Sequence, residues 1–232
     1  MTAMQGEPGH HLARAFRDFI RHRNFPCVGA KAALAQGQLR IIVGRDIRSG
    51  SDDRRIHATL LDLACSHRVN PRSFSSLAVL FEDGTAHDEV GFEGHLWARL
   101  ASLSDKDTRA GLEPDPRVSD DPDDPHFSVS FGGEAFFVVG LHPQASRPAR
   151  RFSAPALIFN LHDQFERLRR SGLYDKLRGV VLERDLALAG SPNPMLANHG
   201  ASSEARQYSG RAVSDDWRCP FAGRNRSATD AA

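Results

Sequence analysis

The sequence predicts a single α+β domain in which helices flank a mixed β-sheet, followed by a long irregular C-terminal segment. A chain of 232 residues, 40% of them hydrophobic, can bury one sizeable core. Short apolar runs typical of strands alternate with longer segments in which apolar residues recur every three or four positions, as in helices. These segments follow no regular βαβ repeat, so we expect a mixed rather than a purely parallel sheet.

Residues 11–23 alternate arginine with apolar residues at helical spacing. They predict an N-terminal surface helix, which we separate from the main domain at residues 24–221. A turn at residues 25–27 and a short alanine-rich helix follow. Residues 38–44 (QLRIIVG) predict a buried strand.

The segment SGSDDRRIHATLLDLACSH predicts a helix with serine and aspartate residues at its start. Its inner face comprises Ile56, Leu60 and Leu63, and the same pattern places Cys65 in the core. Residues 73–81 predict a second strand. The next helix, from Asp88 to about residue 104, has an inner stripe of Phe92, Leu96, Leu100 and Leu103.

The acidic, proline-rich stretch 105–125 lacks apolar periodicity, which indicates a long exposed loop. Two strands are then expected around a Gly132-Gly133 turn. Residues 154–160 predict a last strand, and we expect Asn160 to cap a helix that Gly172 ends. A further helix over about 173–187 precedes the irregular segment.

The irregular segment extends to Phe221, and we expect residues 222–232 to be a disordered tail. It is rich in hydrogen-bonding side chains without helical or strand periodicity. Disordered regions are poor in aromatic residues, whereas this one contains Tyr208, Trp217 and Phe221. We therefore interpret it as an ordered segment that lines a ligand site.

Composition limits the classes of partner. The 30 basic residues nearly balance the 29 acidic ones, which argues against nucleic acid or an anionic membrane as the main partner. No apolar run has the length of a membrane span, and the first residues do not resemble a signal peptide. Three widely spaced cysteines do not suggest a disulfide framework. We expect a cytoplasmic protein.

Cys27 is the first candidate for chemistry. It follows a proline at the expected start of a helix, and small residues come after it. The positive end of a helix dipole favours the thiolate, which attacks electrophiles or binds metals, although a small buried thiol beside a turn is the common alternative. His142 at a strand end, His162 in the first turn of a helix and His199 in the irregular segment are the notable histidines. The residues alone indicate an enzyme or ligand binder with a Cys/His site.

Four segments carry a resemblance: FPCVGAKAAL, GGEAFFVVGLHPQASRPARRF, FNLHDQFERLR and GSPNPMLANHGASSEARQYSGRAV followed by DWRCPF. Through them the chain resembles the YqcI/YcgG family over about residues 24–221. It is more narrowly similar to the branch of haem-dependent guanidine N-hydroxylases of guanitoxin and D-cycloserine biosynthesis. This resemblance implies haem b and a mono-oxygenase that acts on arginine or a related guanidine. It also implies O₂ with an electron donor of unknown identity, such as a reductase, or peroxide.

The resemblance suggests roles for particular residues. Thiolate ligation favours O–O cleavage, so we expect Cys27 to be the axial iron ligand, with Cys219 as the rival thiolate and His142 or His199 as imidazole alternatives. Other cofactor contacts are expected from Arg147, Arg150, Arg151 and Tyr208, the arginines through the haem propionates.

The substrate guanidinium would bind Glu134 or Glu204, and its carboxylate would bind Arg206 or Arg211. Glu204 and His199 are therefore the catalytic candidates beside Cys27. Ordinary surface ion pairs are the alternative for all these arginines and glutamates. A haem-binding or haem-sensing protein without turnover and a haem-free Cys-His enzyme are the alternative functions.

Overall fold

The computed structural model describes residues 9–71, 74–83, 88–195 and 202–221. At its centre is a five-stranded sheet with the order β1-β2-β5-β4-β3. The strands are β1 (Leu39–Gly44), β2 (Ser76–Phe81), β3 (Val129–Phe131), β4 (Glu134–Leu141) and β5 (Ala156–Leu161). β1 and β2 are parallel and the other neighbours antiparallel, so the predicted α+β class with a mixed sheet is confirmed.

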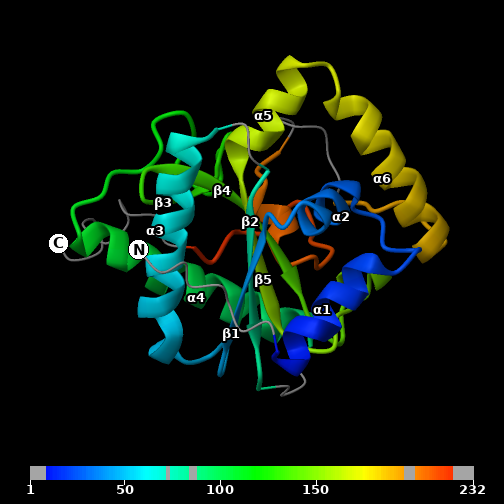
Figure 1. Cartoon of the computed structure of the whole chain (residues 1–232), viewed down its shortest axis with the longest axis horizontal. Coiled ribbons are helices and arrows are strands. Elements are labelled where there is room, and N and C mark those ends of the chain that lie inside the picture. Colours follow the sequence, from blue (N-terminus) through cyan, green and yellow to red (C-terminus); the bar gives the residue numbers. More distant parts are fainter. Residues whose placement is uncertain (1–8, 72–73, 84–87, 196–201, 222–232) are drawn as a thin grey trace.

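Helices cover both faces of the sheet, with α3 and α4 on one face and α1 and α2 on the other (Figure 1). α5 and α6 form an arm at the periphery, where α6 contacts α2 and the turn at 148–150. The helices are α1 (His11–Arg21), α2 (Val28–Ala35), α3 (Asp53–Val69), α4 (Glu89–Arg109), α5 (His162–Arg170), α6 (Tyr174–Ala189) and α7 (Ala205–Tyr208).

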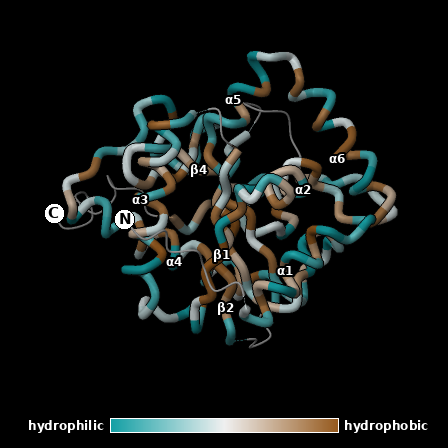
Figure 2. The backbone as a smooth tube through the Cα atoms, in the orientation of Figure 1, coloured by the Kyte–Doolittle hydropathy of each residue, from teal (hydrophilic) through white to brown (hydrophobic). Residues whose placement is uncertain are grey.

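The larger core lies between the sheet, α3 and α4, and the predicted inner stripes of both helices are fully buried in it. The most hydrophobic segments of the backbone accordingly gather at the sheet (Figure 2). α4 approaches β4 closely at Gly140, where a Cβ atom would lie 2.7 Å from Phe92 and 2.8 Å from Leu96. This contact fixes α4 against β4.

The smaller core lies on the opposite face. α1 contributes Leu12, Phe16 and Ile20, and Phe16 packs edge-on against Phe152 at 5.3 Å between ring centroids. The N-terminal helix is thus exposed on one side and buried against the sheet on the other. Ala30 and Leu34 of α2 pack against the same cluster.

The predicted hairpin between β3 and β4 is confirmed. Both turn glycines have positive φ, +61° at Gly132 and +78° at Gly133, as a two-residue hairpin turn of this kind requires.

Four local expectations were wrong. Asn160 does not cap α5, because β5 continues through Leu161 and the Asn160 side chain accepts a hydrogen bond from Ser76 at 2.8 Å. Cys65 is exposed, because it lies beside the buried stripe of α3 rather than on it. α4 continues to Arg109, so the following loop is shorter than expected. That loop is also not wholly exposed, since Asp115 is 1% accessible.

Candidate functional site

A cavity of about 490 Å³ lies beside the start of α5. Three parts of the chain form its walls: the loop that precedes β3, one face of α5, and the segment that leads into α7. Its lining residues are Arg117, Val118, Pro125, His126, Phe127, His162, Asp163, Glu166, Arg170 and Glu204. This size falls in the range of small-molecule sites, and charged and imidazole groups line much of it.

The face of α5 presents polar residues to the cavity at regular spacing. His162, Glu166 and Arg170 are each four residues apart, so they lie on one side of the helix. α5 begins where β5 ends, which places His162 at the C-terminal end of the central strand. A carboxylate, an imidazole and a guanidinium thereby line one wall.

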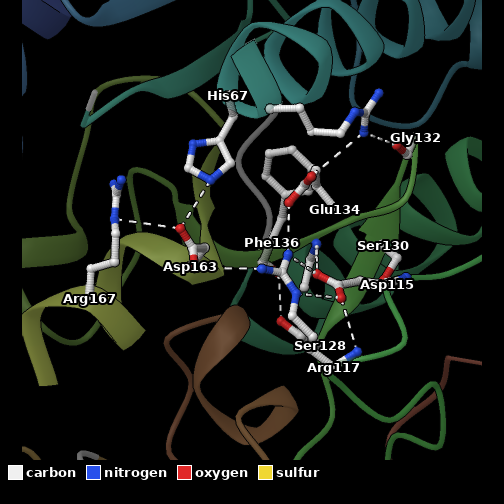
Figure 3. Close-up of polar contacts among 12 residues, drawn as sticks. His67, Asp115, Arg117, Ser128, Ser130, Gly132, Glu134, Phe136, Asp163 and Arg167 are labelled. Carbon is white, nitrogen blue, oxygen red and sulfur yellow. Dashed lines mark hydrogen bonds and ion pairs between the residues drawn. The ribbon is translucent and has the colours of Figure 1, made fainter. Parts of the chain in front are cut away.

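Arg117 forms the opposite wall and is held by two buried carboxylates (Figure 3). Its Nε and Nη2 donate to Asp115 at 2.8 and 2.6 Å, and Nη2 also donates to Glu134 at 2.8 Å. Burial acts to raise the pKa of Asp115, but the bonds from Arg117 outweigh it and hold that pKa below its ordinary value. The same bonds raise the pKa of Arg117, so the guanidinium is permanently charged and rigidly placed.

Asp163 joins the two walls. It contacts His67 of α3 at 3.2 Å, Arg117 at 3.5 Å, Arg167 at 3.5 Å and Arg170 at 3.4 Å (Figure 3 shows the first three). These contacts tie α3, α5 and the loop before β3 around the cavity.

The third wall contains Glu204, which is 9% exposed. Its charge contributes, after burial, to raising the pKa of Tyr208. The Tyr208 hydroxyl donates to the Phe136 carbonyl of β4 at 3.0 Å. Tyr208 itself is fully buried and stacks on Trp97, so the structure gives it a place in the core.

Cys27 is the N-cap residue of α2, as the sequence predicted. Its Sγ accepts a hydrogen bond from the Ala30 amide at 3.4 Å, and the residue is half-buried. The expected lowering of the thiol pKa was wrong. Burial raises the pKa of Cys27, and the Ala30 and Gly29 amides and the Arg150 charge oppose that rise only in part.

A half-buried apolar patch lies on the same face of the sheet as α2. It consists of Val139 of β4, Ile158 of β5 and Ala30 and Leu34 of α2. On the other face, by contrast, central-strand residues such as Val138 and Phe159 are fully buried. The α2 side of the sheet centre is therefore less completely covered than the α4 side.

Phe137 of β4 contacts aromatic rings of two other elements. It is half-buried, and its ring lies 6.0 Å from Phe165 of α5 and 5.4 Å from Tyr208 of α7, between centroids. Successive strand side chains alternate, so Phe137 and Val139 share a face of β4.

The structure does not bring all predicted cofactor residues together. The His142 ring is buried on the α4 side, stacked on Phe92 at 4.4 Å, away from the α2 side that holds Cys27. Cys219 is buried in the same α4-side core. Among the residues that the structure describes, no hydrogen bond joins Cys27 to a histidine. His199 lies outside the described residues.

The arginines that were predicted to bind the haem propionates already have protein partners. Arg147 pairs with Asp185, and Arg151 donates to the carbonyls of Ala145 and Ser146. Arg150 donates to the carbonyls of residues 140, 207 and 208, which ties α7 to the C-terminal part of β4. Burial lowers the pKa of Arg150 to about 10.

The predicted substrate residues divide in a similar way. Glu204 lines the cavity, whereas Glu134 binds Arg117 behind the cavity wall. Arg211 pairs with buried Glu93 of α4, and Arg206 donates to the Ser214 carbonyl at 2.6 Å. The structure thus gives both predicted carboxylate-binding arginines other partners.

Several lining residues were not assigned a role from the sequence, namely Arg117, His126, Asp163, Glu166 and Arg170. The four-residue spacing of His162, Glu166 and Arg170 was a usable signal, because it predicts one polar helix face. The loop residue Arg117 offered no such signal, since its position depends on Asp115 and Glu134.

Comparison with known proteins identifies the family. The YqcI/YcgG family model matches residues 16–222, nearly the whole chain. The chain belongs to the YqcI/YcgG family. It is 28% identical over 153 residues to the Bacillus subtilis (strain 168) protein named "Uncharacterized protein YqcI". That match covers 64% of this chain and 59% of the relative, so the chain spans about three fifths of the relative's length.

No solved structure matches this family member significantly. None of the helices in the described ranges combines the length and the apolar character needed to cross a membrane. The same ranges contain no cluster of three or more histidine, cysteine or carboxylate side chains placed to hold a metal ion.

Proposed function

We propose that this YqcI/YcgG family protein is a haem-dependent mono-oxygenase that N-hydroxylates the guanidino group of arginine or a related guanidine. The observation that carries the proposal is buried Glu204 in a small-molecule cavity whose opposite walls bear arginines. The resemblance of four sequence segments to guanidine N-hydroxylases supplies the reaction type.

Glu204 suits a guanidinium ligand. A guanidinium presents N–H donors in a planar fork that fits a carboxylate through two parallel hydrogen bonds. Because Glu204 is 9% exposed, such a pair would be formed largely out of water, where it is stronger and more selective than on the surface. A neutral urea of the same shape leaves the carboxylate charge uncompensated, so the site should reject citrulline.

The residues around α2 support the proposal of a haem. The half-buried patch of Val139, Ile158, Ala30 and Leu34 offers apolar surface, and Cys27 at its border offers a sulfur ligand. A thiolate-ligated haem supplies oxygen activation. A thiol that binds iron must lose its proton, and the Ala30 and Gly29 amides and the Arg150 charge would stabilise that thiolate.

In this proposal Phe137 lies between the haem and the substrate. It shares a face of β4 with Val139, and its ring contacts Tyr208 of α7, the helix that Glu204 precedes. The reaction requires one O₂, two electrons and two protons, and it yields the N-hydroxyguanidine and one water. An external reductase would supply the two electrons, or hydrogen peroxide would take the place of O₂, electrons and protons together and again yield one water.

The cofactor is tested by the absorption spectrum of protein expressed with ample haem precursor. We expect a Soret band and, for the ferrous-CO complex, a thiolate-type band that Cys27→Ser loses. Cys65→Ser is the matched control, because Cys65 is exposed on α3. An imidazole-type CO spectrum in the wild type would overturn the role of Cys27, and the absence of haem would overturn the proposed cofactor.

The substrate is tested by incubating the protein with arginine, a reductant and O₂, and by calorimetric titration with arginine. We expect a product heavier by one oxygen atom. Glu204→Gln should weaken arginine binding by about tenfold or more and leave the haem spectrum unchanged. Glu183→Gln, on the exposed side of α6, is the control. Haem loss in Glu204→Gln would instead assign Glu204 to the cofactor site or the scaffold.

A further inference from the structure

The charges of the cavity are ordered by exposure. Glu204 is 9% exposed, whereas the side chains of Arg117 and Arg170 are 55% and 68% exposed. The other two lining carboxylates, Asp163 and Glu166, have side chains 12% and 38% exposed. All three acidic groups are therefore more buried than the two basic groups. A ligand that enters with its cation first would leave an anionic group beside the arginines.

We infer that the substrate is a free α-amino acid and that Arg170, backed by Arg117, binds its carboxylate and determines this specificity. The inference rests on the proposed function, which places the guanidino group at Glu204. It replaces the earlier expectation for Arg206 and Arg211, whose guanidinium groups are bound to other parts of the chain.

The geometry of α5 supports this orientation. The cavity-facing residues His162, Glu166 and Arg170 extend over eight residues, or about 12 Å of helix at 1.5 Å per residue. A ligand of about the length of an extended arginine can therefore lie along this face with one end at Arg170. Glu166, midway along this face, pairs with Arg169, so we assign it no substrate contact.

Arg170 is better suited to recognition than Arg117. Arg117 is bonded to Asp115 and Glu134, so its guanidinium is fixed and its charge is largely compensated. Arg170 is exposed and makes one contact at the limit of hydrogen-bond length, 3.4 Å to Asp163. It can therefore turn toward a carboxylate with little loss, while Arg117 supplies a fixed positive wall.

Calorimetric titration of the full-length protein tests this inference with three probes: L-arginine, L-arginine methyl ester and agmatine. The ester neutralises the carboxylate and agmatine lacks it, while the guanidino group is unchanged. We expect L-arginine to bind about tenfold more tightly than either analogue. Arg170→Gln should reduce arginine binding to the level of agmatine and leave agmatine binding unchanged. Arg184→Gln, exposed on α6, should bind all three as the wild type does.

The outcomes separate this inference from the proposed function. Equal affinity of the wild type for arginine and agmatine would overturn the carboxylate site and leave the guanidine site standing. An Arg170→Gln variant that loses affinity equally for L-arginine and agmatine would also overturn the inference, because the effect would then be structural. Thermal unfolding of the variant would show whether the fold is intact. Failure of the wild type to bind any of the three probes would overturn the proposed function, and the inference with it.

Discussion

Glu93 of α4 holds the C-terminal segment that leads from Glu204. Its Oε1 accepts a hydrogen bond from Ser209 at 2.9 Å, and its Oε2 accepts from Arg211 at 3.1 Å and from Trp217 at 3.3 Å. One buried carboxylate thus binds three residues of the segment. Glu93→Ala should release this segment from α4 and leave the sheet intact.

The size of the effect follows from burial. Glu93 is 5% exposed and the Arg211 side chain 24%, so solvent screens the pair little. Removal of one partner of a buried ion pair costs about 3–5 kcal/mol. Arg211 reaches some solvent, so we expect the lower end, about 3 kcal/mol. For a domain of this size, that loss lowers the melting temperature by roughly 6–12 °C.

Circular dichroism melting and hydrogen–deuterium exchange measure the two parts of this prediction. Exchange should rise in peptides covering residues 205–221 before it rises in the strands. Glu93→Gln keeps an acceptor oxygen but loses the charge, and should fall between wild type and alanine. Asp105→Asn, exposed on the same helix, is the control. A melting temperature within about 1 °C of wild type, or increased exchange spread evenly over the chain, would refute the reasoning.

Three further predictions concern stability and reactivity. Gly140→Ala should destabilise the fold by about 1–3 kcal/mol in chemical denaturation, because its Cβ would lie 2.7 Å from a core side chain, whereas Gly94→Ala on the open side of α4 should not. The lowered pKa of Asp115 contributes stability above pH ~4, and this stability is lost as pH falls through the folded-state pKa. Asp115→Asn should therefore reduce the fall in the free energy of unfolding at acid pH. An unchanged fall would contradict this. Because burial raises the pKa of Cys27, iodoacetamide should alkylate it more slowly than exposed Cys65 at neutral pH, as peptide mass spectrometry would show; faster labelling of Cys27 would exclude the raised pKa.

Most of the fold could be predicted because it depends on local periodicity. The inner stripe of α4 and the two glycines of the β3–β4 turn follow from spacing and backbone freedom within a few residues. The errors arose where a distant partner decides the structure. Asn160 is a good helix cap by residue type, but pairing with Ser76 of β2 keeps it in the strand.

The site was harder to predict because its charged residues form ion pairs with residues far away in the sequence. An arginine in a sequence shows its charge but not which carboxylate will neutralise it. From the sequence, Arg211 was a candidate substrate ligand. In the structure it instead pairs with Glu93, which lies more than a hundred residues earlier in the chain. The sequence assigned no role to Arg117, because its place beside the cavity depends on bonds to Asp115 and Glu134 that form only in the folded chain.

The same reasoning separates scaffold from ligand-binding groups. A guanidinium bonded to two buried carboxylates or to several backbone carbonyls, as in Arg117 and Arg150, has little hydrogen-bonding capacity left for a substrate. Such residues instead fix the walls and the surrounding field. We therefore propose that recognition falls to two other lining groups, the buried carboxylate of Glu204 and the exposed guanidinium of Arg170. A molecule with a cation at one end and an anion at the other satisfies both groups, which is why we propose an amino acid that bears a guanidino group.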